Sequence, residues 1–167
     1  MCDLRMFNKI YNDFLCTKKC YMLMRDTVSS IFTANRLHRC IYDVLRVFLE
    51  CGGVKFERTH DIGTLKRLVE KHSIDITFTD WVSDHVDTLT MWESAGRYDV
   101  DFLVEDGRIV KALNEVEEFL AINGFTDELL SEITEKDKEK LSKHIPTNRG
   151  IQSNLEWNVL YKIFKEY

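Results

Sequence analysis

Apolar residues recur every three or four positions along nearly the whole chain, which is the spacing of amphipathic helices. Glycine and proline, which break helices and build the turns of β-proteins, are scarce, with seven Gly and one Pro in 167 residues. A β-sandwich or barrel needs turn residues about every ten positions. The sequence therefore predicts an all-α protein, an up-and-down bundle of four to five helices with a C-terminal helical appendage.

The apolar stripes and the helix-breaking residues place these helices. Phe7, Ile10 and Phe14 begin the first stripe, and a second stripe stops where Gly52-Gly53 allows positive φ angles. The segment 73–78 alternates like a strand but is short and has no evident strand to pair with, so we expect an extended loop. We expect helices over about 6–27, along the stripe from Leu37 to Phe48, over 61–72, from Thr79 or Asp80 to 96–98, and over 105–122.

The composition changes after Phe125. Residues 126–144 are rich in Glu and Lys and have few apolar anchors, which is typical of a surface helix. Pro146 interrupts this segment, and an amphipathic stretch follows over 155–164. We therefore divide the chain into a bundle over 1–125 and a helical extension over 126–167.

Charge and cysteine content limit the cellular setting. The formal net charge is −5, so the field of the whole molecule does not favour non-specific binding to a polyanion. No apolar run approaches the roughly 18 residues that cross a bilayer, and the N-terminus lacks a basic and then apolar leader. The five Cys are an odd number for a disulfide framework. We expect reduced thiols, a cytoplasmic location and no membrane partner.

Four segments between Ala34 and Phe125 follow one another in an order that resembles the HEPN family of small helical bundles. They are Ala34 to Leu49, Arg58-Thr59-His60-Asp61-Ile62, Leu89-Thr90 with Ala95-Gly96-Arg97-Tyr98-Asp99, and Ala112 to Phe119. They are similar to the family's long second helix, its Lys-Thr-His-Asp-Leu segment, its Leu-Thr and Ala-Arg-Tyr-Pro element, and its Ala-rich closing helix. The chain departs from this pattern where His38 and Arg39 replace paired aromatics and where Asp99 replaces proline.

The resemblance implies a bundle that dimerises and acts with nucleotides. Family members are RNA-cleaving toxins or partners of minimal nucleotidyltransferases, so a homodimer, a nucleotidyltransferase partner and a nucleotide or RNA ligand are expected. The chain itself contains no glycine-rich phosphate loop, no paired-Asp nucleotidyltransferase signature and no nucleophile elbow. We expect no cofactor.

Ribonuclease members of the family resemble one another in an Arg followed four to six residues later by a His. In RNA cleavage the imidazole moves a proton and the guanidinium stabilises the phosphorane charge. Here Arg97 stands at the family's position, and no His follows it within that distance. Arg67 and His72 have the spacing but belong to another predicted helix, where a solvent-facing Arg and a His at a helix end are the alternative interpretation.

His60 and Asp61 form a second polar pair. A carboxylate beside an imidazole can fix its tautomer or raise its pKa. In the alternative interpretation, Thr59 and Asp61 cap a helix while His60 bonds a backbone carbonyl. Arg97 and Tyr98 similarly fit either a nucleotide phosphate and base or the end of a helix.

Arg36, Arg39 and Arg46 share one predicted helix face with Asp43 and Glu50. This face is either a solvated, salt-bridged surface or a locally positive cleft in an acidic protein. A separate set, Cys16, Cys20, His38 and Cys40, contains metal-ligating residue types, but the spacing is not that of a zinc finger or ribbon. We expect no metal site.

Three functions remain open. The first is a non-catalytic HEPN-like module that binds a nucleotide or RNA through Arg36, His60, Asp61, Arg97 and Tyr98 and works with a nucleotidyltransferase in a toxin–antitoxin or defence system. The second is a metal-independent ribonuclease toxin with Arg97 or Arg67 as the cation and His60 or His72 as the acid–base group. The third is a protein-interaction scaffold that uses residues 151–167.

Overall fold

The computed structural model describes residues 4–25, 29–99 and 101–127, apart from the side chains of Leu4 and Arg97. These residues form helices and no strand, which confirms the predicted all-α bundle. The helices are α1 (Leu4–Leu23), α2 (Ser30–Cys51), α3 (Ile62–Lys71), α4 (Asp80–Asp84), α5 (Val86–Tyr98) and α6 (Asp106–Ile122).

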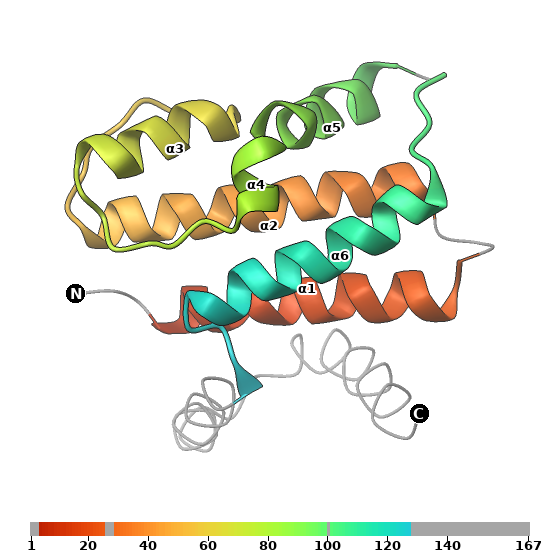
Figure 1. The fold of residues 1–167 in the computed structure, drawn as a ribbon, viewed down its shortest axis with the longest axis horizontal. Coiled ribbons are helices and arrows are strands. Elements are labelled where there is room, and N and C mark those ends of the chain that lie inside the picture. Colours follow the sequence, from red (N-terminus) through yellow and green to blue (C-terminus); the bar gives the residue numbers. More distant parts are fainter. Residues whose placement is uncertain (1–3, 26–28, 100, 128–167) are drawn as a thin grey trace, which may run out of the picture. The chain divides into compact units, whose positions relative to one another are not determined.

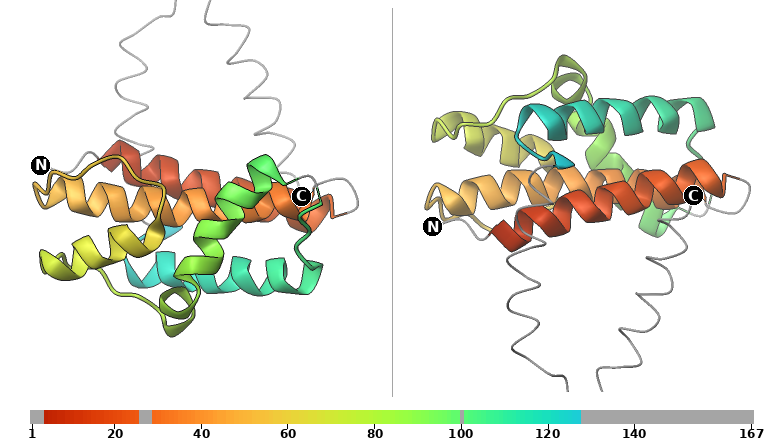
Figure 2. Two further views of the ribbon diagram at one scale, coloured as in Figure 1. Left: turned by 90° about the horizontal axis from the view of Figure 1, so that it is seen from above. Right: turned by 90° about the horizontal axis from the view of Figure 1, so that it is seen from below.

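Helix α2 lies at the centre of the bundle and contacts α1, α3, α5 and α6. Helices α1, α2, α5 and α6 alternate in direction, and Figures 1 and 2 show α2 enclosed between α1 on one side and α3 and α5 on the other. Because α2 has neighbours on several sides, its buried residues are not confined to one apolar stripe. They include the polar side chains Thr33, His38 and Asp43.

The helix ends follow capping chemistry. The Ser29 hydroxyl accepts a hydrogen bond from the Ile31 N–H and starts α2, and this cap was not among the predicted elements. After α2, Gly53 has a φ of 73°, as expected for the glycine pair. Gly124, which follows α6, has a φ of 85°. Helix α1 ends at Leu23, earlier than the predicted boundary near residue 27.

The single helix predicted from Thr79 or Asp80 to 96–98 is wrong, because the chain forms two helices that meet at His85. The Thr79 side chain caps α4 by accepting from the Val82 N–H. The His85 ring places Nδ1 2.8 Å from the Trp81 carbonyl oxygen, an acceptor that the backbone N–H of His85 also uses. This side-chain bond competes with the helical ladder and accompanies the break.

The segment 73–78 is an extended loop, as predicted, and a side-chain amide holds it in place. The Thr77 N–H donates to Asn123 Oδ1, and Asn123 Nδ2 donates to the Thr77 carbonyl, both at 2.8 Å. Asn123 therefore supplies the paired hydrogen bonds that a neighbouring strand would otherwise provide.

Most of the predicted core stripes are buried, but Phe7 and Phe48 are only partly buried and Met24 is exposed. Ile10 and Phe14 of α1 are at most 3 % exposed, and α6 buries all four of its predicted anchors: Ile109, Leu113, Val116 and Leu120. Of the predicted extension over 126–167, residues from 128 on lie outside the described part of the chain. Within the part that is described, no helix combines the length and apolar character needed to cross a bilayer.

Candidate functional site

Asp61 is the N-cap of α3, which is the structural alternative given for the Thr59-His60-Asp61 segment. Its carboxylate accepts the Thr64 N–H at 3.2 Å and the Thr64 hydroxyl at 2.8 Å. Thr59 Oγ1 in turn accepts the Asp61 N–H at 3.1 Å. Burial alone raises the Asp61 pKa, but the hydrogen bonds from Thr64 and Gly63 and the nearby Arg67 lower it overall. These contacts account for Asp61 without a ligand.

The backbone of His60 is hydrogen-bonded to a buried histidine of α2, His38. His38 is 1 % exposed, and its Nε2 lies 2.8 Å from the His60 carbonyl oxygen. Because a carbonyl only accepts, His38 Nε2 carries the proton and donates it. The ring of Tyr42 stacks on both imidazoles, at centroid distances of 6.2 Å to His38 and 5.3 Å to His60. The predicted bond from the His60 ring to a backbone carbonyl is absent from the described residues, and His60 instead accepts the bond from His38 through its own carbonyl.

His38 is held in its neutral form. Burial lowers its pKa, while the bond to the His60 backbone and the nearby Glu93 partly oppose that shift. In the neutral ring the proton is on Nε2, and Nδ1 has no hydrogen-bond partner among the described residues. His38 therefore links α2 to the Thr59-His60-Asp61 segment, and it is not an exposed acid or base.

A groove of about 530 Å³ lies along the C-terminal half of α2 and the segment that follows it, and we call it the basic groove. Four of its lining residues are cationic, one is acidic and two are aromatic. The lining consists of Arg39, Tyr42, Arg46, Glu50, Val54, Lys55, Phe56 and Arg58. From Arg39 to Glu50 the helix advances about 16 Å, at about 1.5 Å per residue. The groove is thus a locally positive surface on an acidic protein.

The two arginines that α2 contributes to the groove each pair with a carboxylate one turn later. Arg39 Nε lies 2.8 Å from Asp43 Oδ2, and Arg46 Nε lies 3.4 Å from Glu50 Oε1. The Arg39 guanidinium also sits 5.2 Å from the centre of the Tyr42 ring, a cation–π contact. These pairs confirm the salt bridges predicted for this face, but the face is not solvated throughout, because Asp43 is buried.

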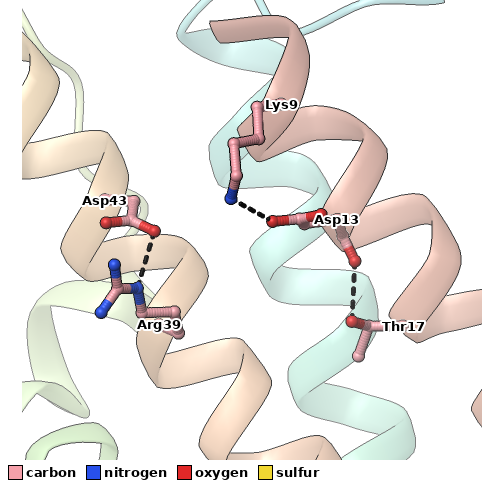
Figure 3. A network of polar contacts seen from close by, with 5 residues as sticks. All are labelled: Lys9, Asp13, Thr17, Arg39 and Asp43. Atoms are coloured by element: carbon pink, nitrogen blue, oxygen red, sulfur yellow. Dashed lines mark hydrogen bonds and ion pairs between the residues drawn. The ribbon is translucent and has the colours of Figure 1, made fainter. Parts of the chain in front are cut away.

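Figure 3 shows the Arg39–Asp43 pair on α2 and the Lys9–Asp13 pair on α1, which lies beside it. Thr17 donates its hydroxyl to the Asp13 carbonyl at 2.7 Å. The side chain of Asp43 is 10 % exposed, whereas Lys9 and Asp13 are more than half exposed. Of the two pairs, only Arg39–Asp43 is shielded enough from water for its loss to matter greatly.

Arg36 lies near the end of α5 rather than in the basic groove. It lines a depression of about 500 Å³ together with Gly96, and its guanidinium sits 5.3 Å from the centre of the exposed Phe32 ring. Tyr98, the last residue of α5, is 83 % exposed. The Arg97 side chain falls outside the described residues, so its predicted phosphate role stays a prediction.

The weaker catalytic candidates lie on α3. Arg67 Nη2 donates to the Thr64 hydroxyl at 2.8 Å, and Arg67 belongs to the cap of Asp61. His72 is exposed at the end of the same helix. These contacts match the structural alternative stated for the Arg67 and His72 pair.

The cysteines do not form a metal centre in the part of the chain that the structure describes. No group of three or more Cys, His, Asp or Glu side chains there is arranged to hold an ion. Cys16, Cys20 and Cys40 are free thiols, and burial raises the pKa of Cys40 above its usual range. Cys51 is disulfide-bonded, so the expectation that all five cysteines are reduced thiols is wrong at this position.

Sequence reasoning missed Lys55 and Arg58 as groove residues. They follow the glycine pair in a segment without regular structure, where no periodicity shows which side chains face α2. The available signal was composition, because two cations and Phe56 occur within four residues after an Arg-rich helix.

No protein-family model, curated protein or solved structure matches the chain.

Proposed function

We propose that this protein is a non-catalytic HEPN-like module that binds a nucleotide or RNA, with the basic groove as its binding surface. The supporting observation is the set of four cationic side chains, Arg39, Arg46, Lys55 and Arg58, gathered around one groove. Phosphate groups are the anions that such a set binds, and Arg offers planar donors that match phosphate oxygens.

The groove also contains an aromatic surface. Phe56 is half-buried and lines the groove beside Lys55. Grooves that combine cations with aromatic rings bind single-stranded nucleic acids, because the cations follow the phosphates and the rings stack on bases. The net charge of −5 does not oppose this, since a bound ligand responds mainly to the charges within about 10 Å of it.

The non-catalytic part of the proposal rests on the histidines. None of the four histidines in the described residues lines the basic groove. His38 is buried with its Nε2 proton committed to the His60 carbonyl, and the His60 ring stacks on Tyr42. Metal-free RNA cleavage requires a proton-transfer group beside the phosphate. Among the described residues, the groove supplies cations without the histidine that serves as this group in the family's ribonucleases.

Binding is tested with the full-length chain, a fluorescently labelled single-stranded RNA, and ATP as a competing mononucleotide. Arg58→Glu reverses one charge in the groove, and Lys111→Glu makes the same change at an exposed site on α6 that does not line it. We expect Arg58→Glu to weaken binding at least about tenfold and Lys111→Glu to change it little. Equal losses in both variants, or no binding by the wild type, would contradict the proposal.

The proposal includes a homodimer, a minimal nucleotidyltransferase partner from a toxin–antitoxin or defence system, and a cytoplasmic location. Size-exclusion chromatography with light scattering measures the mass of the chain alone and after mixing with a nucleotidyltransferase encoded beside it. Because the cytoplasm keeps thiols reduced, a cytoplasmic protein would carry Cys51 in its reduced form rather than in the disulfide. Alkylation of thiols in intact cells followed by mass spectrometry tests the location, because a cytoplasmic protein should show Cys51 as a free thiol.

A further inference from the structure

We infer that the basic groove binds two phosphate charges and that Lys55 and Arg58 are the side chains that bind them. The inference rests on the proposed function. It adds that the four cations have different roles, since some pair with carboxylates and others bind the ligand. Two of these cations form ion pairs on α2, and two have no hydrogen-bond or ion-pair partner among the described residues.

Arg39 and Arg46 are the two cations that already have acidic partners on α2. Arg39 Nε donates a hydrogen bond to Asp43 at 2.8 Å. Arg46 forms a longer ion pair with Glu50 at 3.4 Å, in which Arg46 Nε has no hydrogen-bond partner among the described residues. Oδ1 of Asp43 has no hydrogen-bond partner among the described residues, so Arg39 is the cation that the structure gives to this buried carboxylate. If Arg39 turned toward a ligand, Asp43 would be left unpaired in a shielded site, which is strongly unfavourable.

Lys55 and Arg58 differ from Arg39 and Arg46 in their exposure to solvent and in their contacts. Both are exposed, and neither forms a hydrogen bond or an ion pair with another described residue. They lie on the segment between α2 and α3, which Asp61 anchors at its far end as the cap of α3. Glu57, the acidic residue between them, does not line the groove. Within the described part of the chain, a ligand therefore meets two cations without having to break an ion pair.

The net charge of the groove indicates how many negative charges the bound ligand carries there. The four cations, together with the carboxylates of Asp43 and Glu50, leave two positive charges, which equals the number of cations without a hydrogen-bond or ion-pair partner among the described residues. Two phosphodiester groups of a single strand carry two negative charges, and one terminal phosphate monoester carries up to two. Both sources present the same phosphate oxygens to Lys55 and Arg58.

The number of phosphate contacts can be measured from the salt dependence of the binding constant. Each phosphate contact on a single strand contributes about 0.7 to the slope of log K against log salt, so two contacts predict a slope of about −1.4. Between about 50 and 200 mM NaCl the wild-type affinity should then fall about sevenfold. Lys55→Ala and Arg58→Ala should each reduce the slope by about 0.7, and the double variant should bring it near zero.

The measurement is fluorescence anisotropy of a single-stranded RNA of about ten nucleotides, labelled at its 3′ end, with the full-length protein. Lys111→Ala is the control for an exposed charge outside the groove, and it should keep the wild-type slope. Circular dichroism of each variant shows that the fold is retained.

The outcomes separate this inference from the proposed function. If the wild type binds RNA and the Lys55 and Arg58 variants keep its slope, the inference is wrong and the binding function stands. If the wild type binds neither RNA nor ATP, both fail. RNAs with a 5′-phosphate and a 5′-hydroxyl distinguish the two sources. Tighter binding of the 5′-phosphate form assigns the terminal group, and equal binding assigns internal phosphodiesters. Either result supports the inference when the slopes change as expected.

Discussion

The buried bond between His38 and the His60 carbonyl gives a prediction that separates a hydrogen bond from ring packing. His38→Phe keeps an aromatic ring of similar size beside Tyr42 but removes the donor to the His60 carbonyl. Leaving a shielded acceptor without its donor costs about 1–3 kcal/mol. We expect the variant to lose that amount of unfolding free energy at neutral pH, with only a minor contribution from altered packing.

The pH dependence gives an independent check. The folded-state pKa of His38 is lowered from 6.5, mainly by burial and also by His60 and Arg39, while Glu93 and the backbone bond oppose the shift. As the pH falls below 6.5, the unfolded chain binds a proton that the folded chain does not, so the wild type loses stability. At about pH 5.5 this loss reaches at most about 1.4 kcal/mol. His38→Phe has no such proton, so its deficit should shrink by up to that amount.

Urea unfolding of both proteins, followed by far-ultraviolet circular dichroism at about pH 7.5 and 5.5, measures the two quantities. Taking the difference between the proteins removes the contributions of the other four histidines, which are the same in both. Parallel stability curves across this pH range would show that His38 titrates alike in the folded and unfolded states, and the reasoning from burial would fail. Equal stability at about pH 7.5 would show that the bond contributes nothing.

Three further predictions follow from the caps, the glycines and the catalytic candidates. Asp61→Ala should lower the unfolding free energy by about 1 kcal/mol at neutral pH. That deficit should disappear as the pH falls from about 4 through the lowered folded-state pKa, and urea titrations at neutral and acidic pH measure it. Gly53→Ala should destabilise by about 1–2 kcal/mol because of its positive φ, whereas Gly107→Ala, in the open first turn of α6, should stabilise by up to about 1 kcal/mol in thermal unfolding. Wild type and an Arg97→Ala, His60→Ala double variant should allow equal bacterial growth and leave cellular RNA intact, and arrest by the wild type alone would favour the ribonuclease.

Most of the helical architecture was predictable because it follows from local patterns. The anchors of α6 repeat with helical spacing, and Asn123-Gly124 ends the helix as expected. The break at His85 was not predictable in this way. It depends on whether one imidazole bonds the Trp81 carbonyl, and the apolar spacing of the segment runs unchanged through that point.

The candidate site was less predictable, since its residues come from segments of different kinds. The pairing of Arg39 with Asp43 can be anticipated from four-residue spacing on a helix. The position of Arg58 depends instead on the path of an irregular segment, for which the sequence contains no period. His38 interrupts an apolar stripe, and its partner is a backbone carbonyl, a group that every residue carries and no sequence pattern marks.

The segments that resemble the HEPN family form hydrogen bonds that hold the helices together. A binding surface is therefore better sought outside those segments. His38 bonds the His60 carbonyl, Asp61 caps α3, and the side chain of Asn35 lies 3.5 Å from the Glu93 carbonyl. Substitutions there should therefore act first on stability, through lost bonds between helices. Lys55 and Arg58 lie on an exposed segment and make no such bonds with described residues. Their removal should weaken ligand binding while the melting temperature stays unchanged, and that contrast distinguishes a binding surface from a set of helix contacts.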